Sequence, residues 1–131
     1  MTILLAYVAR PEGEAALEKG IEMAKLRNEF LLVVNATAGG SGADDPARAS
    51  VLEVERLEQR LATCGVPAEF KQFVRGRSAL EEIEELVQTR QVSLLVMGLR
   101  RRSPVGKLIL GSMAQDILMT IECPILVVKA A

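Results

Sequence analysis

Short apolar runs alternate with amphipathic segments along the whole chain. Five runs have the character of strands: 3–9, 30–36, 68–74, 92–97 and 124–129. Between them, apolar residues recur at three- or four-residue spacing, as on the buried face of a helix, in segments that open at residues 11, 46, 78 and 112. The pattern therefore predicts five strands and four helices in strict alternation.

Capping residues mark where two of these helices begin. Asp45 is the predicted N-cap of the second helix, with Pro46 as its first residue, and Gly65 ends that helix. Ser78 and Glu81 form the capping-box pattern at the start of the third helix.

Strict alternation with short connections predicts one α/β domain. Right-handed crossovers then produce an open parallel sheet of five strands with helices on both faces, and 131 residues suffice for one such domain. The run 68–74 alternates apolar and polar residues more than the others, which predicts an edge strand. Ligands of such sheets bind outside the carboxyl ends of the strands where the strand order reverses, so the loops after the first and fourth strands are the candidate site.

Composition excludes several classes of function. A formal net charge of −1 and few aromatic residues give no reason to expect nucleic acid or a membrane as partner. The absence of histidine removes a Ser-His-Asp triad and imidazole-bound zinc. Apolar runs far shorter than about 20 residues, with no signal peptide before Ile3, predict a cytoplasmic protein. Cys64 and Cys123 are expected to be reduced thiols.

The loop after the fourth strand carries the candidate chemistry. Gly98 follows the strand, and Gly111-Ser112 opens the last helix, whose backbone N–H groups suit a phosphate. Four basic residues lie in the same loop: Arg100, Arg101, Arg102 and Lys107. The alternative is that Ser112 only caps the helix, with Gln115 completing a capping box, and that the arginines are solvated. Neither a Walker loop nor a GxGxxG pattern after the first strand is present.

The chain resembles the universal stress protein family over its whole length. The resemblance lies in ILLAY…PEGEAALEKGIEMA, EEIEELVQTRQVSLLVMG and GKLILGSMAQDILMTIECPILVVK. Members that bind ATP carry a glycine, two residues, a glycine, nine residues, then glycine with serine or threonine, which Gly98, Gly111 and Ser112 match. The resemblance implies a Rossmann-like, adenine nucleotide alpha hydrolase-like fold with strand order 3-2-1-4-5, bound ATP, with or without Mg²⁺, and a homodimer.

Two positions depart from the family pattern. Arg101 occupies the place of the middle glycine, and its guanidinium either replaces lost backbone contacts to phosphate or fills the site. Val8 stands where nucleotide-binding members tend to have an aspartate that contacts adenine, so one hydrogen bond to the base, worth about 1–2 kcal/mol, is absent.

The same alignment implies a nucleotide pocket built from the ends of three strands and the long loop. Its predicted residues are Ala6, Tyr7, Val8, Val34, Met97, Gly98, Arg100, Arg101, Gly111, Ser112 and Met113. Tyr7 could stack on the base or be packed in the core, while Val34 and Met97 would be apolar wall in either case. No catalytic residue and no metal ligand is assigned.

The sequence of the last predicted strand indicates pairing with a second protein chain. It is as apolar as a central strand although it would lie at a sheet edge, and exposed apolar edges pair with other chains. The resemblance implies a dimer formed by the final strands. The predicted interface residues are Pro124, Ile125, Leu126, Val127 and Val128.

Three functions are consistent with these features. The first is a small stress-associated protein that binds ATP or a related nucleotide and acts as a dimeric regulatory switch. The second is a dimeric interaction module of the same fold that binds no nucleotide because Arg101 fills the site. The third is a slow ATP hydrolase, for which Gln115 or Asp116 would orient water. Helix capping and surface exposure explain both residues more simply, so the sequence favours a role without catalysis.

Overall fold

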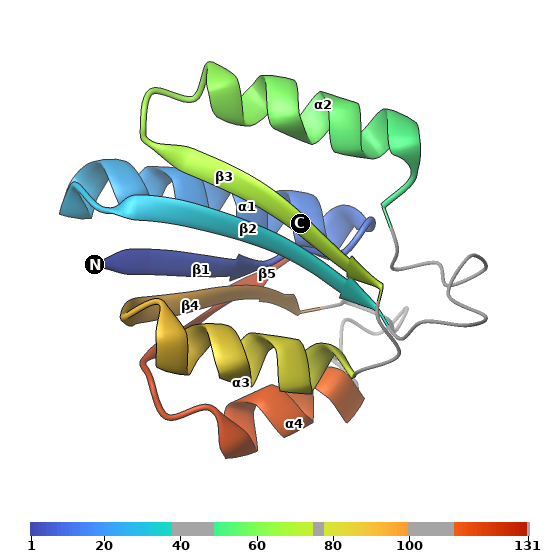
Figure 1. Ribbon diagram of the computed structural model, residues 1–131, viewed down its shortest axis with the longest axis vertical. Helices are drawn as coiled ribbons and strands as arrows, with labels where there is room; N and C mark the ends of the chain where they lie inside the picture. The colour runs from blue at the N-terminus through green and yellow to red at the C-terminus, as the bar shows by residue number, and fades with distance from the viewer. Residues whose placement is uncertain (38–48, 75–77, 100–111, 131) are drawn as a thin grey trace.

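The structure is a computed structural model that describes residues 1–37, 49–74, 78–99 and 112–130. Within these ranges five parallel strands form one sheet in the order β3-β2-β1-β4-β5 (Figure 1). The strands are β1 (Thr2–Ala6), β2 (Phe30–Thr37), β3 (Ala68–Val74), β4 (Val92–Leu99) and β5 (Ile125–Lys129). The helices between them are α1 (Pro11–Arg27), α2 (Val51–Ala62), α3 (Ala79–Thr89) and α4 (Ser112–Thr120). The predicted α/β architecture, the strand order and the edge position of β3 are confirmed.

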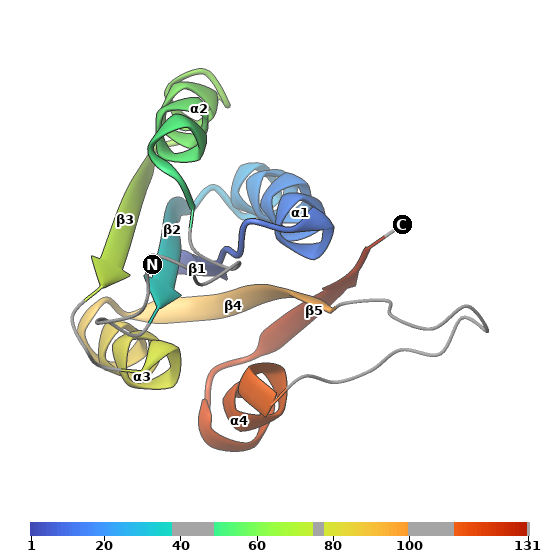
Figure 2. The same cartoon turned by 90° about the vertical axis from the view of Figure 1, so that its right-hand side faces the viewer.

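Helices cover both faces of the sheet. α1 and α2 lie on one face and α3 and α4 on the other, as Figures 1 and 2 show together. Side chains of β1 alternate between the two layers: Ile3 and Leu5 pack with α1 and α2, and Leu4 packs with α3 and α4. All three are fully buried, which explains why the first strand is apolar at every position from Ile3 to Ala6 rather than at every second one.

The strands that flank the candidate site differ in length from the prediction. β1 ends at Ala6 rather than at residue 9, because the chain turns there and the Arg10 N–H donates to the Val8 carbonyl (2.8 Å). β4 continues to Leu99 rather than ending at residue 97, since β5 runs beside it and pairs Gly98 with Val128. β5 itself begins one residue after the predicted start.

The second helix begins later than predicted. α2 starts at Val51, and its N-cap is Ser50, whose hydroxyl oxygen accepts a hydrogen bond from the Glu53 N–H (3.2 Å). The prediction of Asp45 as cap with Pro46 as first residue is therefore wrong for this helix; both residues lie outside the described ranges. Serine followed three residues later by glutamate is itself a helix-start pattern, and it stands immediately before the amphipathic segment.

Two other predictions about local structure are confirmed. The capping box of α3 is complete: the Glu81 N–H donates to the Ser78 hydroxyl oxygen (3.1 Å), and the Ser78 N–H donates to the Glu81 carboxylate (3.0 Å). Cys64 and Cys123 are both free thiols. Across the ranges that the structure describes, no helix has the length and apolar character needed to cross a bilayer.

Candidate functional site

Three of the predicted pocket residues lie side by side at the point where the strand order reverses. Ala6 of β1 is paired in register with Val34 of β2 on one side and with Met97 of β4 on the other. All three belong to the core cluster under α3 and α4, together with Ile117 of α4. They form a buried apolar layer at the carboxyl ends of the central strands, next to the position expected for a ligand of this fold.

Gly98 is required by packing against α1. A Cβ atom at this position would lie 2.1 Å from the backbone oxygen of Glu12 and 2.6 Å from its carbonyl carbon. The missing side chain therefore makes room for the first turn of α1, in addition to any role in admitting a ligand. Glycine at the end of β4 was predicted from the motif, whereas this contact with α1 was not.

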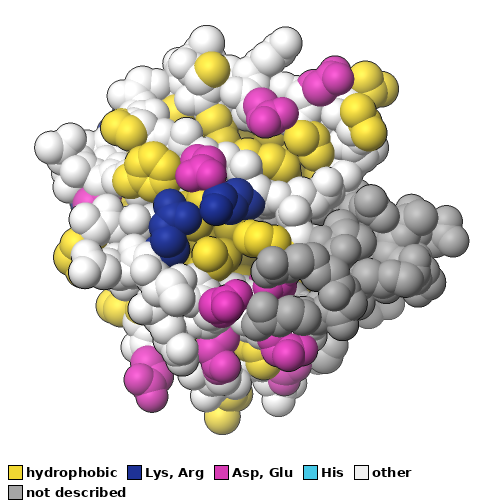
Figure 3. All heavy atoms as spheres, in the orientation of Figure 1, with side chains coloured by type: hydrophobic (Ala, Val, Ile, Leu, Met, Phe, Trp, Pro, Cys, Tyr) yellow, Lys and Arg dark blue, Asp and Glu magenta, His cyan; other side chains and the backbone are white. Residues whose placement is uncertain are grey.

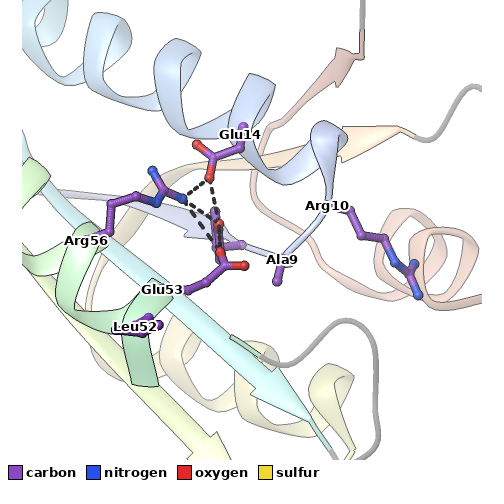
Figure 4. Close-up of a pocket in the computed structure, with 7 residues that line it drawn as sticks. Ala9, Arg10, Glu14, Leu52, Glu53 and Arg56 are labelled. Carbon is purple, nitrogen blue, oxygen red and sulfur yellow. Dashed lines mark hydrogen bonds and ion pairs between the residues drawn. The ribbon is translucent and has the colours of Figure 1, made fainter. Parts of the chain in front are cut away.

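The side chain of Tyr7 is packed in the core and is not open for stacking on a base. Its side chain is on the opposite face of the sheet from Ala6, and only 2% of it is exposed. The hydroxyl lies 2.9 Å from a Glu14 carboxylate oxygen and 3.3 Å from one of Glu53, and Arg56 donates to the phenolic oxygen (3.4 Å). Tyr7 thereby links the end of β1 to the first turns of α1 and α2. Figure 4 shows the side chains of Glu14, Glu53 and Arg56 pointing toward one another between these helices.

This polar cluster lines a shallow pocket of about 390 Å³ between the two helices. Arg56 forms ion pairs with Glu14 and with Glu53, the latter at 3.7 Å. Burial, followed by the hydrogen bond to Glu14 and the negative charges of Glu14 and Glu53, raises the pKa of Tyr7 well above that of a free phenol. Arg10 belongs to the pocket lining but points away from the cluster in Figure 4. The charged groups here are thus largely paired with one another.

Asn35 is a residue of this region that the sequence did not single out. It lies in β2, is completely buried, and is paired in register with Gln72 of β3. Its amide nitrogen donates to the Tyr7 carbonyl (3.0 Å), and its amide oxygen accepts from the Ala49 N–H (2.9 Å) and from Gln72 Nε2 (3.0 Å). The sequence feature that could have indicated its role is the single amide side chain within the otherwise apolar run FLLVVNA.

Several predicted residues cannot be placed relative to this site. Arg100, Arg101 and Gly111 lie outside the described ranges, as does the side chain of Ser112, so the capping box at α4 stays a prediction. The side chain of Met113 also lies outside the described residues. The backbones of Ser112 and Met113 belong to the first turn of α4.

The remaining predicted residues are described. Val8 is half-buried in the turn after β1. Gln115 and Asp116, the candidates for orienting water, are both exposed on α4. Within the described ranges, no group of three or more acidic, cysteine or histidine residues could hold a metal ion.

Charge on the neighbouring surface disfavours an anion there. Acidic side chains gather on the lower part of the face seen in Figure 3, where Figure 1 places α3. The sequence of that helix, ALEEIEELVQT, contains four glutamates. The surface along α3 is therefore unfavourable for an anion.

Comparison with known proteins identifies relatives along the entire chain. The profile of the universal stress protein family matches residues 1–129. A universal stress protein of Mycolicibacterium smegmatis is 46% identical over 127 residues, which cover 97% of this chain and 96% of the relative. The Thermus aquaticus universal stress protein encoded in the QAH/OAS sulfhydrylase 3' region is 30% identical over 135 residues, covering 98% of each chain.

Solved structures of the same family share the fold. The universal stress protein of Archaeoglobus fulgidus has a TM-score of 0.76 at 26% identity, covering 98% of this chain and 97% of that one. An A. fulgidus universal stress protein in complex with dAMP has a TM-score of 0.70 at 20% identity, with 98% and 96% covered. A universal stress protein in complex with cAMP has a TM-score of 0.73 at 17% identity, with 100% and 98% covered.

Proposed function

The chain belongs to the universal stress protein family, and from that premise we propose that it binds an adenine nucleotide, ATP first among the candidates, at the carboxyl ends of β1 and β4. The observation that carries this proposal is the strand-order reversal itself, where Ala6, Val34 and Met97 form an in-register apolar layer at the carboxyl ends of three strands. The complexes of two proteins of the same fold with dAMP and cAMP support adenine as the base.

In this proposal the base and the phosphates of the nucleotide bind at two different parts of the fold. The base lies near the turn after β1, at Tyr7 and Val8. The phosphates lie near the first turn of α4, because unpaired backbone N–H groups and the helix dipole favour an anion there. The spacing from Gly98 to Gly111-Ser112 supports the same assignment, and Mg²⁺ would accompany the phosphates as part of the ligand.

We further propose that the protein works as a cytoplasmic homodimer joined through β5. The Leu95 N–H donates to the Pro124 carbonyl (2.9 Å), so every second residue from Pro124 onward bonds to β4. The backbone groups of Ile125, Val127 and Lys129 therefore face away from β4 and are available to a second copy. Light scattering at tens of micromolar protein tests this, and a monomeric mass would overturn it.

Binding is tested by thermal unfolding with and without millimolar ATP and Mg²⁺. A ligand present at about 100 times its Kd stabilises the native state by about 2.7 kcal/mol, which raises Tm by several degrees. Mass spectrometry of the denatured protein tests in parallel whether nucleotide is carried through purification. No shift in Tm together with no carried nucleotide would overturn the proposal. Binding that appears only in the Arg101→Gly protein would instead show that Arg101 fills the site.

A further inference from the structure

Three strands present a row of polar contacts on the face covered by α2. Tyr7 lies immediately after β1 and continues its ladder, since its N–H donates to the Val34 carbonyl (2.8 Å). The next residue of β2, Asn35, is paired in register with Gln72 of β3. Tyr7, Asn35 and Gln72 therefore form one line across β1, β2 and β3 at the carboxyl edge of the sheet.

The orientation of the Asn35 amide is determined by its partners. A backbone carbonyl can only accept and a backbone N–H can only donate, so the amide nitrogen must face Tyr7 and the amide oxygen must face Ala49. Gln72 Nε2 donates to that same oxygen and also to the Ala49 carbonyl (2.9 Å). One buried side chain thus holds the end of β1 and the residue before the N-cap of α2 in a single arrangement.

The Tyr7 carbonyl needs this partner because it lies past the last residue of β1. Asn35 is fully buried and donates to it directly. Without the amide, the carbonyl would lose a buried hydrogen bond, and the Tyr7–Val8 peptide would lose the contact that sets its direction. That peptide starts the turn to which the proposed function assigns the base.

We propose that Asn35 is a positioning residue of the nucleotide site. It acts through the Tyr7 backbone, orienting the segment at Tyr7 and Val8 that meets the adenine base, and it does not contact the phosphates. This inference rests on the proposed function and assigns separate roles within it: Asn35 of β2 orients the base end of the site, and the first turn of α4 receives the phosphates.

The test compares three ligands on the full chain. Isothermal titration calorimetry well below Tm measures the Kd for ATP, adenosine and inorganic tripolyphosphate. In the Asn35→Leu protein, which keeps the side-chain size but loses both polar atoms, affinity for adenosine and for ATP should fall by the same factor, about tenfold. Affinity for tripolyphosphate should not change, and a general loss of stability would not produce that separation.

Two further variants serve as a control and as a substitute for Asn35→Leu. Ser93→Ala removes a comparable part-buried hydrogen bond, from Ser93 Oγ to Glu29 (2.6 Å), at the start of β4 and far from the predicted site, and should leave all three affinities unchanged. Should Asn35→Leu fail to reach the native circular dichroism spectrum, Gln72→Met is used, since it removes one donor to Asn35 and keeps the Asn35 amide. Its expected loss is about threefold for adenosine and ATP alone.

The outcomes separate this inference from the proposed function. If the unmodified protein binds ATP and the variant binds adenosine and ATP as tightly, the role of Asn35 is wrong and nucleotide binding stands. An equal loss of tripolyphosphate affinity also overturns the inference, because it indicates a general disturbance of the fold. If the unmodified protein binds none of the three ligands, the proposed function fails and the role of Asn35 fails with it.

Discussion

The hydroxyl of Tyr7 lies 2.9 Å from the carboxylate of Glu14, and this hydrogen bond joins the end of β1 to the first turn of α1. Arg56 of α2 donates to the Tyr7 oxygen and pairs with Glu14, so one phenol connects the central strand to both helices on its face. The relationship makes Tyr7 a structural reporter, because it is the chain's single tyrosine and there is no tryptophan.

We expect Tyr7 to resist ionisation in the native protein. Burial and the adjacent carboxylates raise its pKa above the ordinary phenol value of about 10. A group with a raised native pKa contributes stability that is present below about pH 10 and is lost as the pH rises further. Ultraviolet absorbance should therefore show tyrosinate appearing only together with unfolding above about pH 10.

The Tyr7→Phe protein provides the control for this pH effect. It should lose about 1–2 kcal/mol of unfolding free energy at neutral pH, because the hydroxyl's hydrogen bonds to Glu14, Glu53 and Arg56 are removed while these three charged groups remain paired with one another. Its remaining alkaline destabilisation should be smaller than that of the unmodified protein. Native tyrosinate absorbance that rises near pH 10 without unfolding would contradict the assignment of a buried, hydrogen-bonded phenol.

Gly98→Ala should destabilise the fold whether or not nucleotide is present. The new Cβ would lie 2.1 Å from the Glu12 backbone oxygen, and neither backbone can move away without disturbing β4 or α1. We expect a loss of more than about 3 kcal/mol, or roughly 10 °C in Tm, by calorimetry. Substitution of Gly98 therefore cannot serve as a clean test of nucleotide binding.

Gly20→Ala is the matched control for Gly98. Its Cβ would meet the end of a flexible side chain, Leu5 Cδ1 at 2.5 Å, rather than backbone. The gain in helix propensity, about 1 kcal/mol, offsets much of that crowding. Tm should change by only a few degrees. Equal losses for the two glycines would show that the contact with Glu12 is not what constrains Gly98.

Val127→Pro should weaken the proposed dimer without unfolding the subunit. Proline removes the N–H that faces away from β4, and proline is tolerated in edge strands. Val127→Ala trims the same side chain but retains that N–H, so it is the control. Sedimentation velocity should show a lower dimer fraction for proline than for alanine at the same concentration. Equal dimer fractions for the two variants would argue against backbone pairing through β5.

Ser50→Ala should cost about 1 kcal/mol of stability through loss of the α2 cap. Ser50→Asp should retain most of it, because aspartate also accepts from the Glu53 N–H and interacts favourably with the helix dipole. Urea unfolding measures both variants. If alanine proved as stable as serine, the helix would not depend on this cap, and its start at Val51 would need another cause.

Sequence patterns predicted what depends on local chemistry. The capping box of Ser78 and Glu81 is formed by residues three apart, and the fully apolar first run was sufficient to predict a strand buried on both faces. The start of α2 was missed because Asp45-Pro46 and Ser50 are both acceptable helix starts, and only the latter caps the helix.

Contacts between distant segments could not be predicted in the same way. Ala6, Val34 and Met97, which the family resemblance placed in one predicted pocket, come from three strands and are brought side by side by parallel pairing. The contact of Gly98 with Glu12 depends on how closely α1 approaches β4, and nothing in the local sequence encodes that distance. The bonds of Asn35 likewise depend on the register of three strands, which one strand alone does not reveal.

The close approach of Gly98 to the first turn of α1 also bears on how such proteins diversify. A side chain at this position would force β4 and α1 apart, so substitutions elsewhere at the end of β4 are compatible with the packing of the sheet only while glycine is retained here. For protein engineering, Gly98 is therefore a position to keep as glycine when other residues near the end of β4 are changed.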